Sequence, residues 1–481
     1  MSKAHQLRLV VLCGWFLLCA AFAVRNSETE ALAAQDGPSQ NLDRQFQSAV
    51  AQYHAGKYTE AAVQLESILP SVPKSFEVRE ILGLTYAALS ENEKALEQLA
   101  IAVRLKPDSG AARTNLATAL ASSGKLELAE AQFRRALALE PGDFGANHNL
   151  ADFYLQTNRI ANALPLLEQA QRINPSSYSN GYDLALVYFL MGRLEDARQL
   201  VQNMVKQKNT GELHNLLGQI EEKDGRYLQA ANEFQIAAQM DPSEDNLFAW
   251  GSELLLHRTY EPAIDVFQQA TRHYPNSPRL LIGLGMALYS QGRYEESIKS
   301  LLTAADLDPT DARCYLFLSK SYLSSPNQAD DVIERFRRYS ELQPDNALAK
   351  YYYAVSLWKG KRLEGPSVDF RAVESLLHKA IALDGTIADA HLQLGILYAD
   401  QHELSKSLPE YRRALELNPS LPDAHYRLGQ YYVRAGQKDH AREEFALYQR
   451  LQAQHMAAVD KERAEIQQFV YSAKPGSVTK P

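Results

Sequence analysis

Cysteine is scarce in this sequence, with three residues among 481. Two of them, Cys13 and Cys19, lie in an apolar segment at the start of the chain. If that segment is removed, Cys314 is the only cysteine left, which excludes an intramolecular disulfide and leaves packing to stabilise the fold. We interpret Cys314 as a small packing residue near the start of a helix rather than as a reactive thiol.

Motifs of catalysis and metal binding are also missing. The sequence has no GxSxG, HExxH, CxxC, GxxxxGK(S/T) or EF-hand pattern. Its 12 histidines are scattered and lack the short spacing of metal ligands. We therefore predict that the chain is not an enzyme and holds no metal or cofactor.

A basic surface is lacking as well. Lys and Arg number 50 against 58 Asp and Glu, so the net charge is -8. Nucleic acid is not an expected partner, because neutralising its phosphates requires clustered cations. We interpret the local cluster of Arg335, Arg337 and Arg338 as a solvated helix face.

Long apolar runs are lacking except near the start of the chain. Two basic residues precede an apolar run of 16 residues, 9–24, which is typical of an export signal and short for a membrane span. Residues 21–23 (Ala-Phe-Ala) and 31–33 (Ala-Leu-Ala) are two candidate cleavage sites. We expect an exported, periplasmic or secreted protein. Its residues 1–33 are a signal peptide with a short spacer, or an uncleaved anchor that makes the only contact with the membrane.

Proline, in contrast, recurs at a fixed interval. Pro73, Pro107, Pro141 and Pro175 are spaced by 34 residues, a period that indicates helical hairpins. In this frame proline at position 32 ends the second helix, and glycine at position 15 allows a left-handed turn between the helices. The glycines at position 15 are Gly56, Gly124, Gly192, Gly225, Gly292 and Gly436.

The residues between these turns follow one pattern of large, small and aromatic side chains. For the repeat that starts at Phe76, positions 7, 8, 11, 20, 24 and 27 are Leu82, Gly83, Tyr86, Ala95, Leu99 and Ala102. This pattern resembles the tetratricopeptide repeat. The resemblance implies an all-α, right-handed superhelical solenoid, in which small residues let helices approach closely and large residues fill the remaining space.

We count about twelve helix-turn-helix repeats over residues 42–455. They leave no room for a separate catalytic domain. Two irregularities are expected, at Asn209, which stands where proline is expected, and at residues 360–369, which are predicted to form an extra loop. A solvating helix over 456–471 and a disordered tail over 472–481 are predicted to follow. The repeats start at Leu42, Phe76, Gly110, Phe144, Tyr178, Gly211, Glu244, Pro278, Ala312, Ala347, Ala388 and Pro422.

The resemblance also implies where a partner would bind, because the first helices of such repeats line a concave groove. Position 6 of three successive repeats is Asn115, Asn149 and Asp183. This row resembles the asparagine ladder by which some family members hold an extended peptide, since a carboxamide both donates to C=O and accepts from N–H. The alternative is a set of ordinary polar groove residues. The two-carboxylate clamp of members that bind chaperone tails is not supported, because position 5 of the first four repeats carries no lysine.

Further along the chain, the groove positions become apolar and aromatic. An exposed apolar stripe several repeats long predicts a site for a peptide, a helix or a second copy of the chain. The alternative is that tighter curvature buries these side chains against neighbouring repeats. The stripe comprises Phe248, Ile282, Met286, Tyr289, Leu316, Tyr351, Tyr352, Val355 and Trp358.

These patterns predict a non-enzymatic, exported scaffold that binds extended peptides or helices of other proteins in its concave groove. The alternative is an accessory or regulatory subunit of an envelope enzyme, or of a complex that secretes polysaccharide or protein. Both hypotheses imply protein partners, and neither requires a cofactor or a nucleic acid.

Overall fold

The computed structural model describes residues 38–454 except residues 327 and 365–368. Every regular element among these residues is helical, with one 3-10 turn, η2 (Leu69–Ser71), and otherwise α-helices. The chain divides into an N-terminal part that ends at Lys206 and a C-terminal part that begins at Gln207. The predicted leader and the helix and tail predicted after residue 455 lie outside the described residues.

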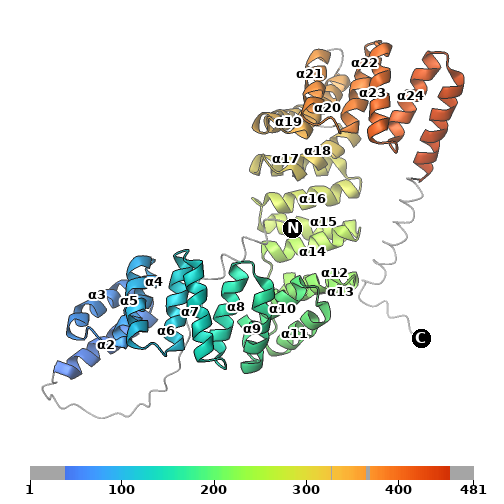
Figure 1. Cartoon of the computed structure of the whole chain (residues 1–481). Helices are drawn as coiled ribbons and strands as arrows, with labels where there is room; N and C mark the ends of the chain where they lie inside the picture. Colours follow the sequence, from blue (N-terminus) through green and yellow to red (C-terminus); the bar gives the residue numbers. More distant parts are fainter. Residues whose placement is uncertain (1–37, 327, 365–368, 455–481) are drawn as a thin grey trace, which may run out of the picture. The chain divides into compact units, whose positions relative to one another are not determined.

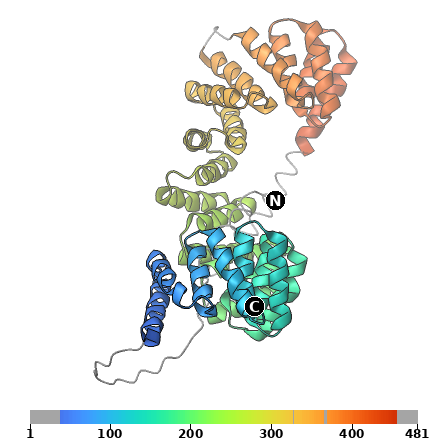
Figure 2. The same ribbon diagram turned by 60° about the vertical axis from the view of Figure 1, so that its left-hand side comes forward.

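Within each part the helices pair as hairpins that stack in chain order (Figures 1 and 2). The first part contains α2 (Pro38–His54), α3 (Tyr58–Ile68), α4 (Phe76–Ala88), α5 (Asn92–Leu105), α6 (Gly110–Ser122), α7 (Leu126–Leu139), α8 (Phe144–Gln156), α9 (Ile160–Ile173) and α10 (Tyr178–Leu190), and α11 (Leu194–Gln207) ends at its border.

The second part contains α12 (Gly211–Lys223), α13 (Tyr227–Met240), α14 (Glu244–Leu256), α15 (Tyr260–His273), α16 (Pro278–Ser290), α17 (Tyr294–Leu307), α18 (Ala312–Ser324), α19 (Ala329–Leu342), α20 (Ala347–Glu364), α21 (Phe370–Leu383), α22 (Ala388–Asp400), α23 (Leu404–Leu417) and α24 (Pro422–Arg434). Residues 438–454 are helical and pair with α24 as the last described hairpin. The predicted fold class, an all-α array of about twelve helix-turn-helix repeats, is confirmed.

The first helices begin where the repeat frame predicts. Eleven of the twelve predicted starts, from Phe76 onward, are the first residue of a helix, whereas α2 begins at Pro38 instead of Leu42. The residue before the helix often caps it. The side chains of Ser109 and Asp143 each accept a hydrogen bond from the backbone N–H three residues further on. Such a cap satisfies an N–H group that no carbonyl inside the helix can reach.

The turn inside ten of the twelve hairpins is left-handed at position 15. The six glycines predicted there have φ between 73° and 82°. Four other repeats adopt the same conformation without glycine, with φ between 58° and 63° at Ser90, Asn158, Arg258 and His402. These ten hairpins therefore adopt the same conformation with or without glycine, and residues with a Cβ atom bear a steric cost there.

Large residues at position 24 pack onto glycines of the first helices. A Cβ atom added to Gly251 would lie 2.8 Å from the ring of Phe267, and one added to Gly283 of the next hairpin would lie 2.5 Å from the same ring. Both distances are shorter than van der Waals contact, so the ring fits only because both positions lack a side chain. This packing is the reason for the small and large positions of the sequence pattern.

One detail corrects a sequence-based expectation, and another concerns proline inside helices. Helix α20 continues to Glu364, so residues 360–364 are helical where a loop was predicted. The segment consists largely of Lys, Arg, Leu and Glu, which favour helix. Pro165 and Pro409 lie inside α9 and α23, yet both helices begin at the same repeat position as other second helices. Proline inside these second helices therefore does not shift where they begin.

Candidate protein-binding groove

The three polar residues predicted at position 6 lie on the first helices of consecutive hairpins in the N-terminal part. Asn115 is on α6, Asn149 on α8 and Asp183 on α10, and all three are half-buried. Nδ2 of Asn115 donates a 3.0 Å hydrogen bond to Oε1 of Glu80 on α4. Asn149 makes no side-chain hydrogen bond within the described part of the chain. Its carboxamide can therefore donate to and accept from a bound peptide.

Two carboxyl groups flank this row and are poorly solvated. Burial raises the pKa of Glu80, although the hydrogen bond from Asn115 opposes the rise. Burial also raises the pKa of Asp152 on α8, despite the neighbouring His148 and a 2.8 Å hydrogen bond from Nε2 of Gln156. Backbone N–H groups or cationic side chains of a partner would restore the interactions that these carboxylates lose on burial.

His148 links α8 to the next first helix, α10. Its Nδ1 lies 3.3 Å from Oδ1 of Asn180, and its ring stacks on Phe144 with centroids 5.3 Å apart. Burial lowers the pKa of His148, so the neutral imidazole is favoured. The side chain therefore contributes a neutral hydrogen-bonding group to the groove.

The C-terminal part has a second polar run that the sequence analysis missed. Nε2 of Gln219 donates to Oδ1 of Asn215 at 2.6 Å, and Nδ2 of Asn215 donates to Oδ1 of Asn246 at 2.8 Å. Asn246 in turn donates to the carbonyl oxygen of Asp241 at 2.8 Å and so satisfies the end of α13. Asn215 and Gln219 occupy groove positions 5 and 9, and this signal was available in the repeat frame.

Five of the nine residues predicted as an exposed apolar stripe are buried, so exposure was the wrong expectation for them. All five belong to one core cluster of the C-terminal part, where side chains from neighbouring repeats cover them. Tyr352, for example, packs with its ring centroid 5.8 Å from that of Phe336 on α19. The five buried residues are Ile282, Tyr351, Tyr352, Val355 and Trp358.

The other four residues of the stripe are half-buried. Met286 and Leu316 pack against the same core cluster. The guanidinium of Arg279 lies 4.6 Å from the centre of the Phe248 ring, and Tyr289 makes an edge contact with Phe317 at 5.9 Å. These four side chains therefore keep only partial exposure.

The described residues contain no group of His, Cys, Asp and Glu side chains that could hold a metal ion. Cys314 is fully buried, and its Sγ donates to the carbonyl oxygen of Leu301 at 3.1 Å. Burial, with nearby carboxylates, raises the pKa of this thiol, so it stays protonated, and the packing interpretation is confirmed. None of the described helices combines the length and apolar character needed to cross a bilayer.

Several segments of the chain match models of one type of repeat among known protein families. A tetratricopeptide repeat profile matches residues 82–144, 114–178 and 248–312, and a second one matches 158–220. A TPR repeat profile matches residues 397–436. Together the matched segments cover about half of the 481 residues.

Two curated relatives illustrate the sequence similarity. The TPR repeat-containing protein YpiA of Bacillus subtilis (strain 168) is 26% identical over 192 residues, which are 39% of this chain and 42% of the relative. Protein O-mannosyl-transferase TMTC1 of Homo sapiens is 24% identical over 214 residues, 44% of this chain and 23% of the relative. The chain thus spans less than half the length of these relatives.

Solved structures with similar helical arrays include yeast Tom70, at a TM-score of 0.36 and 16% identity over 91% of this chain and 98% of that one. Another is YrrB, described as a TPR protein with an unusual peptide-binding site, at a TM-score of 0.33 and 19% identity over 38% of this chain and 95% of that one.

Proposed function

The chain belongs to the tetratricopeptide repeat family, and from that premise we propose that it is a non-enzymatic scaffold that acts after export and holds extended segments or helices of other proteins. The binding surface is the row of first helices α4, α6, α8 and α10 in the N-terminal part. Repeat arrays of this kind bind through many weak contacts from successive repeats.

One observation carries this proposal. The carboxamide of Asn149 is half-buried on α8 and has no hydrogen-bond partner among the residues the structure describes. Polar groups in such positions usually find a partner in the folded protein or in water. The backbone of an extended peptide would supply both a donor and an acceptor at this place, and the half-buried carboxyl groups of Glu80 and Asp152 would receive further N–H groups.

The proposal is tested by affinity capture from the exported fraction with three forms of the full chain: wild type, Asn149→Leu and Glu127→Ala. Glu127 is exposed on the second helix α7, so its variant is the control. We expect wild type and the control to retain the same partner, and Asn149→Leu to lose it while its far-ultraviolet circular dichroism is unchanged. Calorimetry with the purified partner should then show at least a tenfold loss of affinity. Equal recovery by all three forms would refute the groove as the binding surface.

Export is a separate element of the proposal, and the apolar run at residues 9–24 supports it. We expect the protein recovered from its host to lack the first 23 or the first 33 residues, according to the two small-residue sites. Mass spectrometry of the intact protein measures this directly. A chain that retains Met1 would contradict cleavage, and its absence from the exported fraction would contradict export.

A further inference from the structure

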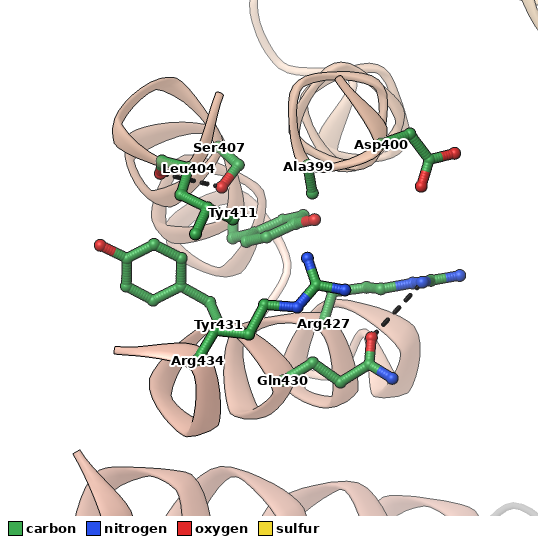
Figure 3. Close-up of a pocket in the computed structure, with 9 residues that line it drawn as sticks. All are labelled: Ala399, Asp400, Leu404, Ser407, Tyr411, Arg427, Gln430, Tyr431 and Arg434. Carbon is green, nitrogen blue, oxygen red and sulfur yellow. Dashed lines mark hydrogen bonds between the residues drawn. The ribbon is translucent and has the colours of Figure 1, made fainter. Parts of the chain in front are cut away.

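A polar hollow lies in the C-terminal part between α22, α23 and α24 (Figure 3). It is small, with a cavity volume of about 20 Å³, and it opens to solvent. No residue of the polar row in the N-terminal part contributes to it. The residues that line it are Ala399, Asp400, Leu404, Ser407, Tyr411, Arg427, Gln430, Tyr431 and Arg434.

One wall of the hollow is tightly packed. Tyr411 on α23 is only 2% exposed, and Ser407 is fully buried. The hydroxyl of Ser407 donates to the carbonyl oxygen of Leu404 at 3.0 Å, so this polar group is already satisfied within the helix. This wall gives a bound group a fixed surface.

The opposite side of the hollow carries two arginines of α24. Arg427 and Arg434 are seven residues apart, which is about two helical turns, so they lie on the same face of the helix. Neither guanidinium forms an ion pair with another residue that the structure describes. Arg427 has only a long contact of 3.5 Å from Nη1 to Oε1 of Gln430. Asp400 is the one carboxylate of the lining, so the hollow has a net positive charge.

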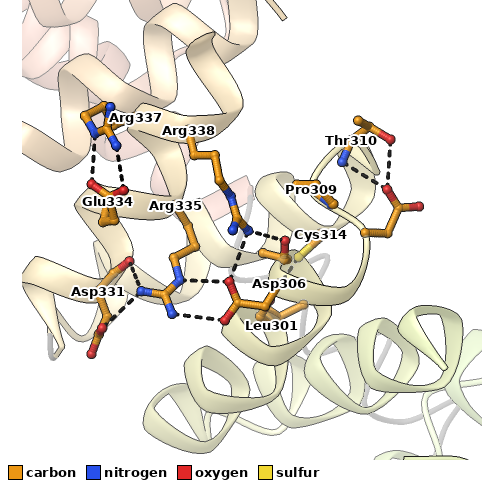
Figure 4. A network of polar contacts seen from close by, with 12 residues as sticks. Leu301, Asp306, Pro309, Thr310, Cys314, Asp331, Glu334, Arg335, Arg337 and Arg338 are labelled. Atoms are coloured by element: carbon orange, nitrogen blue, oxygen red, sulfur yellow. Dashed lines mark hydrogen bonds and ion pairs between the residues drawn. The ribbon is translucent and has the colours of Figure 1, made fainter. Parts of the chain in front are cut away.

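The contrast with other arginines of the same part is clear. Arg335 and Arg338 on α19 both bind the carboxylate of Asp306 on α17 at 3.0 Å, and Arg337 binds Glu334 at 2.7 Å (Figure 4). That basic cluster is neutralised within the protein and needs no external anion. The two arginines at the hollow lack such partners, although the chain as a whole has an excess of acidic residues.

We propose that this hollow binds the carboxylate of an Asp or Glu side chain in an acidic segment of a partner protein. The inference deepens the proposed function and rests on it, because it adds a second recognition point for a protein ligand. A guanidinium matches a carboxylate with two parallel N–H···O bonds, and the Gln430 amide adds a donor beside it. Polyanions such as nucleic acid are disfavoured by Asp400 and by the acidic chain.

The test uses fluorescence anisotropy with the full chain and a labelled nonapeptide amide, Gly-Ser-Pro-Glu-Ser-Glu-Pro-Ser-Gly. Its counterpart has Gln in place of both Glu residues. We expect the Glu peptide to bind at least tenfold more tightly than the Gln peptide, with a preference that weakens as salt concentration rises. The double variant Arg427→Gln and Arg434→Gln should bind both peptides equally.

The matched control removes two arginines that already have partners. Arg413 binds Glu416 at 2.9 Å and Arg442 binds Asp439 at 3.3 Å, so changing both to Gln alters the net charge equally without touching the hollow. This control should keep the preference for the Glu peptide, and circular dichroism should show that both double variants are folded.

Three results would overturn the inference. They are equal binding of both peptides by wild type, a preference that survives in the Arg427 and Arg434 variant, and loss of the preference in the control. Competition by inorganic phosphate at concentrations where acetate has no effect would also overturn it, in favour of a phosphate site. Because the Asn149 test concerns the other part of the chain, it can succeed when this inference fails.

Discussion

Nε2 of His214 lies 2.7 Å from Oδ1 of Asn209, the residue that stands where neighbouring repeats have proline. At the same repeat position, Arg113 donates from Nη2 to the carbonyl oxygen of Pro107 at 2.7 Å. His214 therefore contacts the side chain of the residue at position 32, whereas Arg113 contacts the backbone of the residue there. Its other ring nitrogen, Nδ1, lies 2.5 Å from Oε2 of Glu233. The start of α12 is thus tied both to the preceding connection and to its partner helix α13.

The first prediction concerns Asn209. Replacing Asn209 by Ala removes the partner of a nearly buried ring nitrogen, so we expect the free energy of unfolding to fall by about 1 kcal/mol. Urea unfolding followed by circular dichroism measures the effect. The control is Asn203→Ala, at an exposed site on α11, which should change stability by less than about 0.5 kcal/mol. Equal effects at both sites would show that the contact with His214 does not stabilise the repeat.

The second prediction concerns pH. Glu253 on α14 is 2% exposed, and burial together with Glu222 raises its pKa from 4.5 to about 8. Its Oε1 lies 3.3 Å from Nε2 of His257, whose pKa is lowered by burial. The fold therefore favours the neutral carboxyl group. Stability from this group is complete below about pH 4.5 and is lost as the pH rises through about 8.

Glu253→Gln keeps the shape of the side chain and removes its ionisation. We expect the variant to be more stable than wild type by roughly 2 to 4 kcal/mol near pH 9, and about equal to it near pH 4.5. Thermal unfolding across this range gives the difference curve, and the exposed Glu127→Gln should give a much flatter one. A difference that does not grow with pH would contradict the buried neutral carboxyl.

The third prediction tests helix packing at Phe267. Gly283→Ala places a methyl group where only 2.5 Å is available to the ring, so we expect a loss of about 1 to 3 kcal/mol. Gly142→Ala is the matched control, because nothing lies within 4 Å of a Cβ atom there. Denaturant midpoints of the two variants give the comparison. Similar midpoints would mean that Phe267 can move aside without cost.

The fourth prediction tests the left-handed turn. Gly124 has φ of 73° and open space around it, so Gly124→Ala should cost about 1 kcal/mol through backbone strain alone. Ser90 has the same conformation at φ 62°, and Ser90→Gly should remove strain and stabilise the protein by up to about 1 kcal/mol. Ser90→Ala keeps the Cβ atom and removes only the hydroxyl, so it measures the effect of losing the hydroxyl apart from the relief of backbone strain. If Gly124→Ala and Ser90→Gly change the free energy of unfolding in the same direction, backbone strain at the left-handed turn does not explain their effects.

Much of the fold could be predicted from the sequence because each hairpin is specified locally. The spacing of Pro107 and Pro141, with Gly124 between them, places two helices and their turn in the right register. The candidate site was less predictable. The frame placed Asn149 on a first helix correctly, but it gave no sign that Asn115 would bond to Glu80, since that contact joins residues 35 positions apart.

The sequence by itself determined the repeat, the helix starts and the class of residue at each position, because these depend on neighbours within one hairpin. Only the tertiary structure decided which groove positions remain accessible. Trp358 and Tyr352 occupy groove positions, yet both are buried in a core shared with other repeats. Whether such a side chain is covered depends on how closely consecutive hairpins stack. That distance is set by pairs of distant residues, such as Phe267 against Gly283, and no local pattern records it.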